Sequence, residues 1–238
     1  MRPWSPIPIA DNGEPLLDLP PELKRLEPHP YQSLGAPYGA TASPFRLRQG
    51  VIARLLTAQR HLEQDRSGWR LAIFDAWRPL AVQRFMVEDA IAEECRLRGV
   101  DPLRPSPERE ALVAEVGRFW APPSDDPTTP PPHSTGAAVD LSLVDSNGAP
   151  VAMGSAIDAI GAISEPDHPG QQALRLPAGD EREHLLSAQR HRDLLRQSME
   201  AAGFAQHPNE WWHFSWGDQL WAWRRGVSQA HYGRWQDP

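Results

Sequence analysis

Apolar residues recur at the spacing of an α-helix in several stretches of this chain. In the first, Val51, Leu55, Ala58 and Leu62 fall on one face, which is the pattern that a period of about 3.6 residues produces. The other stretches end at glycines or in loops rich in proline, which are typical helix stops. The pattern predicts helices over residues 45–66, 79–98, 107–119 and 181–202.

Shorter stretches with strand character lie between and after these helices. In residues 137–144 large apolar side chains alternate with small or polar ones, so that Val139 and Leu141 share one face of a strand and Asp140 lies on the other. The turn signal Ser146-Asn147-Gly148 then allows a return strand. The pattern predicts strands over residues 69–75, 137–144, 149–153 and 211–216, and a short helix over 218–225.

The order of these elements predicts an α+β fold. Helices come first, and strands with one long helix between them follow, which favours a single domain with a small antiparallel sheet flanked by helices. Residues 1–44 are rich in proline and glycine, so we expect an extended arm across the domain, and residues 45–238 form the domain itself. Residues 154–180 read as a loop.

Composition and charge exclude several classes of protein. The net charge is −7 and no run of lysine or arginine occurs, which argues against a nucleic-acid partner. The single cysteine, Cys95, allows no intrachain disulfide. No apolar stretch is long enough to span a membrane, and residues 1–10 lack the apolar core of a signal peptide. We therefore expect a cytoplasmic protein, and the sequence does not predict its oligomeric state.

The stretch from Pro132 to Asp140 carries two groups that bind zinc. His133 and Asp140 lie seven residues apart with Gly136 between them. Residues an odd number apart on a straight strand face opposite sides. A turn at Gly136 would bring His133 from a loop toward Asp140 on the strand.

A second imidazole and a second carboxylate come from Glu210 and His213. They are three residues apart, so a bend near Pro208 is needed to bring both to one ion. A catalytic zinc site has three N or O ligands and an open position, and a nearby free carboxylate is needed to move protons. Charge and geometry therefore assign His133, Asp140 and His213 to a metal and leave Glu210 as the general base.

Arg78 follows the predicted strand 69–75 and precedes Pro79, at a junction where active-site residues are often presented. It could stabilise an oxyanion, or it could simply pair with Asp75 at the turn. Each metal-binding spacing is weak by itself, and His207 is the main alternative ligand.

Three segments occur in this order: residues 74–79 (FDAWRP), 133–143 (HSTGAAVDLSL) and 210–216 (EWWHFSW). Together they resemble the D-alanyl-D-alanine dipeptidases of the vancomycin-resistance type, zinc peptidases that share the Hedgehog/DD-peptidase fold. The resemblance covers roughly residues 45–225. It implies one zinc ion on His133, Asp140 and His213, Glu210 as general base and then acid, and Arg78 as the transition-state stabiliser.

The resemblance further implies a small D,D-dipeptide substrate, a cytoplasmic location and a link to cell-wall metabolism. Two departures concern the substrate. Pro131 stands where the family has a serine, and the segment from Met153 to Asp158 lacks the aromatic residue of the family.

Two other functions stay open at this stage. A peptidoglycan D,D- or L,D-carboxypeptidase should need export and an open cleft. A zinc-containing binding module without catalysis would have no need of Glu210 and Arg78.

Overall fold

The structure is a computed structural model that describes residues 2–39 and 43–236. Its α- and 3-10 helices are α1 (Pro30–Ser33), α2 (Gln49–Asp65), α3 (Leu80–Leu97), α4 (Pro107–Val116), η1 (Pro132–Thr135), η2 (Ala162–Ser164), α5 (His168–Ala173), α6 (Asp180–Ala201) and α7 (Gln219–Arg225). Its strands are β1 (Leu16–Asp18), β2 (Lys24–Arg25), β3 (Arg46–Arg48), β4 (Arg70–Asp75), β5 (Ala138–Val144), β6 (Ala205–Gln206) and β7 (His213–Ser215). The α+β class expected from the sequence is confirmed.

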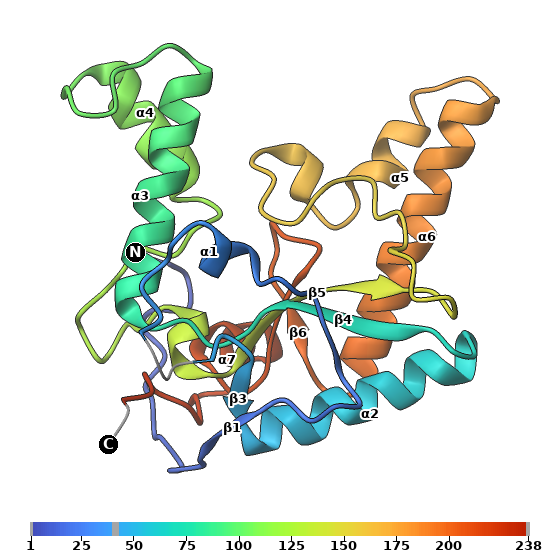
Figure 1. The fold of residues 1–238 in the computed structure, drawn as a ribbon, viewed down its shortest axis with the longest axis horizontal. Helices are drawn as coiled ribbons and strands as arrows, with labels where there is room; N and C mark the ends of the chain where they lie inside the picture. Colours follow the sequence, from blue (N-terminus) through green and yellow to red (C-terminus); the bar gives the residue numbers. More distant parts are fainter. Residues whose placement is uncertain (1, 40–42, 237–238) are drawn as a thin grey trace.

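The main sheet has five strands in the order β2-β4-β5-β7-β6. All neighbouring pairs are antiparallel except β2 and β4, which pair in parallel over two residues. A shift of register between Ile73 and Asp75 ends the regular pairing of β4 with β5. The two longest strands, β4 and β5, thus form the middle of the sheet, and short strands form its edges (Figure 1).

Two apolar clusters hold the elements together. The larger joins α2, α6 and the apolar side chains of β4 and β5, with Leu55, Leu195 and Leu141 fully buried in it. The smaller joins α3 and α4 to the N-terminal segment through Tyr31, Val82 and Trp120. In Figure 1, α3 and α4 stand as a pair at one side of the molecule and α6 at the other.

Much of the N-terminal segment packs on the rest of the chain. Strand β1 pairs with β3, and β2 extends the main sheet. The buried Arg48 donates hydrogen bonds to the carbonyls of Thr135 and Gly233 and forms an ion pair with Asp11. The division of the chain into an arm and a catalytic domain at residue 44 stays a prediction.

The longer predicted elements are present with small changes at their ends. The predicted first helix begins later, because Arg46–Arg48 form strand β3 instead. The return strand expected over 149–153 is wrong: only an isolated bridge between Val144 and Pro150 forms there. Helix α5 lies in the stretch read as a loop. No helix in the described parts of the chain combines the length and the apolar character needed to cross a membrane.

Candidate metal centre and active site

His133 lies on the single turn η1, and Gly136 ends that turn in the left-handed region at φ +71°. A side chain at this position would also come too close to Leu16 Cδ1, so the Leu16 side chain would have to shift. The positive φ therefore favours glycine here, and the close approach of Leu16 adds a steric cost for any other residue. The turn predicted at Gly136 is confirmed, and it aims His133 back toward β5.

Asp140 and His213 come from neighbouring strands. They are direct partners in the antiparallel pairing of β5 with β7. Side chains opposite each other in such a pair point to the same face of the sheet. The register of the sheet therefore brings together two residues that are 73 positions apart in sequence.

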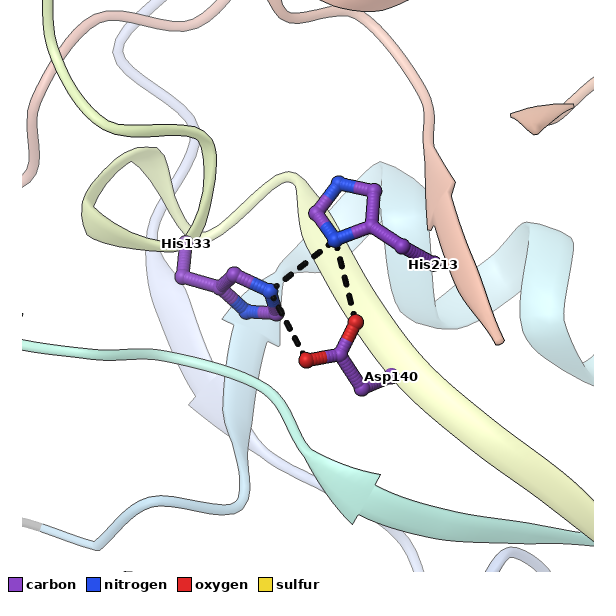
Figure 2. A group of neighbouring side chains, drawn as sticks. All are labelled: His133, Asp140 and His213. Carbon is purple, nitrogen blue, oxygen red and sulfur yellow. Dashed lines mark hydrogen bonds and ion pairs between the residues drawn. The ribbon is translucent and has the colours of Figure 1, made fainter. Parts of the chain in front are cut away.

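His133, Asp140 and His213 form one compact group (Figure 2). His133 Nε2 lies 3.2 Å from Asp140 Oδ2 and 3.2 Å from His213 Nδ1, and His213 Nδ1 lies 3.0 Å from Asp140 Oδ1. One ligand atom from each residue lies within 4.8 Å of the others. Two imidazoles and one carboxylate with this spacing match the donor set of a divalent metal site with a position left open.

The surroundings fix the orientation of these groups. His133 Nδ1 donates to the carbonyl of Ala76 at 2.7 Å, which leaves Nε2 free to bind a metal. His213 Nε2 lies 3.4 Å from the Ser215 hydroxyl, so Nδ1 faces the group. Burial opposes ionisation of Asp140, but the charges and hydrogen bonds of His133 and His213 outweigh burial and hold the pKa of its carboxyl well below its usual range.

Glu210 lies beside this group but outside it. Its carboxylate is 3.7 Å from His213 Nδ1 and 3.4 Å from His207 Nδ1. Oε1 is buried and accepts no hydrogen bond from the residues that the structure describes. Burial first, and then the charges of Asp140 and Asp158, raise the pKa of Glu210 well above its usual range. A buried carboxylate in this state is suited to exchange protons with a molecule that enters the site.

Arg78 forms the ion pair with Asp75 that its sequence context allowed, and it also lies near the metal group. Its Nε and Nη2 donate to Asp75 at 3.0 and 2.7 Å, and Nη2 also lies 3.6 Å from Asp140. Nη1 donates to Gln83 at 2.9 Å. Burial opposes its charge, but Asp75 together with Tyr31 and Asp140 raises the pKa of Arg78 further. The guanidinium is therefore a fixed positive charge at the edge of the metal group.

A cavity adjoins all of these side chains. His133, Asp140, His213, Glu210 and Arg78 line it, so the structure brings the five predicted site residues to one cavity. His207 lines the cavity too, but it is not one of the three residues of the metal group.

The sequence analysis missed Asp158 as a member of the site. Asp158 lines the cavity and accepts a hydrogen bond of 2.8 Å from the Tyr31 hydroxyl. Its φ is +65°, an uncommon value for a residue other than glycine. Burial, followed by the charge of Asp140, raises the pKa of Asp158 to about 7. One signal in the sequence could have identified Asp158: the segment from Met153 to Asp158 is similar to a segment of the family, and Asp158 is its last residue.

The N-terminal segment also reaches the site. Arg2 and Trp4 line the cavity together with Trp120. Residues so far from the three motifs carry no sequence signal that links them to the metal group.

The fold and this arrangement define a class: an α+β protein in which a group of two histidines and one aspartate that could hold a metal ion, a glutamate and an arginine surround one cavity. Comparisons with known proteins give the particular family. The profile of Peptidase_M15, described as D-ala-D-ala dipeptidase, matches residues 24–233. The chain therefore belongs to the Peptidase_M15 family of D-Ala-D-Ala dipeptidases, as the resemblance in its sequence implied.

Individual proteins agree with this assignment. A D-alanyl-D-alanine dipeptidase of Synechocystis sp. is 44% identical over 98% of this chain and 97% of its own length. The chain also resembles the D-alanyl-D-alanine dipeptidase of Escherichia coli, at 30% identity over 62% of this chain and 55% of the relative.

A solved structure offers a more distant likeness. It is that of a mutant vancomycin-resistance D,D-pentapeptidase, VanY, in complex with Zn(II). The match covers 94% of this chain and 96% of the other at 13% identity, with a TM-score of 0.47. This likeness is too low to extend to the site.

Proposed function

We propose that this protein is a zinc dipeptidase that hydrolyses D-Ala-D-Ala or a closely related D-amino-acid dipeptide. The observation that carries the proposal is the group of His133, Asp140 and His213, with the unbonded carboxylate of Glu210 beside it. Membership of a dipeptidase family and the full-length similarity to a D-alanyl-D-alanine dipeptidase support the same substrate.

The three residues of the group would hold the metal through His133 Nε2, an Asp140 oxygen and His213 Nδ1. The donor set fits zinc, because two neutral imidazoles and one carboxylate leave the ion with a net positive charge. A zinc ion there supplies a Lewis acid and makes water a usable nucleophile near neutral pH.

Glu210 would carry the proton. Its carboxylate faces the metal group through Oε2, 3.7 Å from His213 Nδ1, and its buried Oε1 has no hydrogen-bond partner among the described residues, so the ionised carboxylate is placed to accept a proton from the attacking water. The same carboxyl then gives the proton to the amine that leaves when the peptide bond breaks.

Arg78 would stabilise the negative charge that develops on the carbonyl oxygen. Its ion pair with Asp75 and its hydrogen bond to Gln83 fix the guanidinium before substrate arrives. Preorganised charges of this kind lower the barrier without reorganisation during the reaction.

Asp158 would bind the amino group of the dipeptide. It lines the cavity, is separate from the metal group and from Glu210, and accepts a hydrogen bond from the neutral Tyr31 hydroxyl, while burial raises its pKa. An ammonium group beside it would supply a positive charge and return the pKa of Asp158 toward its usual range.

The direct test is an assay of the purified protein with D-Ala-D-Ala, with and without zinc and after chelation. We expect hydrolysis that is lost on chelation and restored by zinc, and little activity on a peptidoglycan stem pentapeptide. Hydrolysis of the pentapeptide in preference to the dipeptide would instead identify a carboxypeptidase. Zinc binding without hydrolysis of any peptide would identify a binding module.

The cytoplasmic location and the link to cell-wall metabolism belong to the same proposal. Hydrolysis of a free dipeptide in the cytoplasm would remove a cell-wall precursor. Fractionation of cells that express the protein tests the location, and recovery in the membrane or exported fraction would refute it.

A further inference from the structure

The N-terminal turn lies over the cavity. The backbone closes on itself through hydrogen bonds from Ser5 N to Arg2 O and from Ile7 N to Trp4 O. Both Arg2 and Trp4 line the cavity that holds the metal group. The turn is therefore a wall of the active site, although it lies outside the matched family segment, which begins at residue 24.

Several contacts hold this turn in place. The buried Gln219 at the start of α7 donates from Nε2 to the carbonyls of Ser5 and Ile7. Ile9 forms a parallel bridge with Ala230, which the hydrogen bond from Ala10 N to Ala230 O extends. Side-chain and backbone bonds to the C-terminal part of the chain thus anchor the turn on both sides.

Trp4 is a buried residue of the cavity lining. Only 6% of its surface is exposed. Its ring meets the edge of His207 at 5.6 Å and lies 5.6 Å from Trp223. Because His207 lies beside Glu210, the packing of Trp4 connects the turn to the proposed general base.

Arg2 brings a positive charge to the same wall. Nη1 and Nη2 each donate to a backbone carbonyl, those of Arg118 and Trp120, both at 3.0 Å. Within residues 2–39 and 43–236, no carboxylate forms an ion pair with it at 4 Å or less. Burial lowers the pKa of Arg2, and the charge of Glu210 acts in the opposite direction.

The positive charge of Arg78, the other arginine in the cavity lining, is already balanced by carboxylates. Arg78 donates twice to Asp75 and also lies near Asp140. Arg2 spends two N–H donors on neutral carbonyls and keeps the others. A half-buried guanidinium that has spare donors, and no carboxylate partner among the described residues, is suited to bind the carboxylate of a ligand.

We propose that Arg2 is a specificity-determining residue that binds the free α-carboxylate of the dipeptide. This inference rests on the proposed function, because that function defines a substrate with an amino group at one end and a carboxylate at the other. With Asp158 at the amino group and Arg2 at the carboxylate, both charged ends of a dipeptide meet an opposite charge.

This arrangement also selects the length of the substrate. A peptide with one more residue at its C-terminal end would present a neutral amide to Arg2 in place of a carboxylate. This disfavours binding of the longer peptide, because the charge of the guanidinium then stays uncompensated.

The test compares D-Ala-D-Ala with D-alanyl-D-alaninamide, in which only the carboxylate is replaced. We expect the unmodified protein to prefer the acid by about 10-fold to 100-fold in kcat/KM, the range of a charge-assisted hydrogen bond. Arg2→Met should reduce this preference to within about 3-fold, mainly through a higher KM for the acid. Arg2→Lys should keep part of the preference because it keeps the charge.

The ratio of the two substrates separates the possible roles of Arg2. If Arg2 acts only through Glu210, or only supports folding, Arg2→Met lowers both activities equally and the preference survives, which overturns the inference. Arg104→Met, at an exposed position, is the matched control and should leave the ratio unchanged. If the unmodified protein hydrolyses neither substrate, the proposed function itself fails.

Discussion

At the scale of single residues, the proposed mechanism depends on one carboxylate that lies outside the candidate metal group. Glu210 lies 3.7 Å from His213 Nδ1 and carries an unbonded buried oxygen. Substitution distinguishes a metal ligand from a proton carrier. Replacing a ligand weakens metal binding, whereas replacing a proton carrier lowers the rate and leaves metal binding intact.

We therefore expect Glu210→Gln to bind zinc with the same stoichiometry while kcat falls by about 10²–10⁴-fold, the usual contribution of a general acid or base. Metal analysis and steady-state kinetics on D-Ala-D-Ala measure the two quantities. Glu63→Gln, on the exposed face of α2, is the control. Loss of the metal in the Glu210 variant would show that Glu210 is a ligand.

Asp158 predicts a dependence of substrate binding on pH. With its pKa raised to about 7, the carboxyl gains a proton as the pH falls through this value and then attracts an ammonium group less. KM for D-Ala-D-Ala should therefore rise below about pH 7, by up to about 10-fold per pH unit. A metal ion bound nearby would lower the pKa of Asp158 and move this rise in KM to lower pH.

Asp158→Asn should raise KM at neutral pH and remove the pH dependence of KM in this range. Initial rates at several substrate concentrations, measured from about pH 5 to about pH 9, give KM as a function of pH for the variant and for the unmodified protein. A variant with the same KM profile as the unmodified protein would exclude Asp158 from binding the amino group.

At the scale of secondary-structure elements, the turn between η1 and β5 is the critical connection. Gly136 combines a positive φ with a close approach to Leu16. Gly148 also has a positive φ, at +80°, but no atom lies within 4 Å of a Cβ built there. The two positions therefore separate backbone strain from steric collision.

Gly136→Ala should lower the free energy of unfolding by about 2–5 kcal/mol, from strain and overpacking together. Gly148→Ala should cost about 1–2 kcal/mol, from strain alone. Denaturant unfolding of the two variants measures both values. Equal losses would show that the contact with Leu16 relaxes freely.

Elements with a strong local pattern could be predicted from the sequence. The apolar stripes of α2 and α6 and the alternation in β5 gave their positions to within a few residues. The weak edge strands and α5 could not be predicted, because two-residue strands have no periodicity and α5 has no apolar stripe. The expected return strand fails because only one bridge forms after the turn at Gly148.

The residues of the site also differ in how far the sequence could predict them. His133, Asp140, Glu210, His213 and Arg78 lie in contiguous motifs, so spacing and resemblance together pointed to them. Asp158 and Arg2 reach the cavity through long-range packing, by way of Tyr31 and Gln219. Such contacts between distant segments leave no pattern in a single sequence.

At the scale of the whole molecule, the metal should act as a ligand that stabilises the fold. The three residues proposed to hold it come from η1, β5 and β7, and their ligand atoms lie within 4.8 Å of one another. Anything that binds the folded state alone raises stability, by about 4 kcal/mol at a concentration about 1,000 times above Kd.

Zinc added to metal-free protein should therefore raise Tm by about 10 °C, given the usual relation between free energy and Tm at this size. His213→Ala should abolish most of the shift, and His184→Ala, at an exposed position of α6, should preserve it. Thermal unfolding with and without zinc measures the effect. An equal shift in all three proteins would place the ion elsewhere.

The anchoring of the N-terminal turn affects how the protein should be handled. A purification tag fused before Arg2 would begin beside two residues that line the active-site cavity, Arg2 and Trp4. It could obstruct entry of the dipeptide or pull the turn from Gln219, so an inactive preparation would report on the tag and not on the enzyme. Removal of the tag, or a recombinant form without one, is the appropriate material for kinetic work.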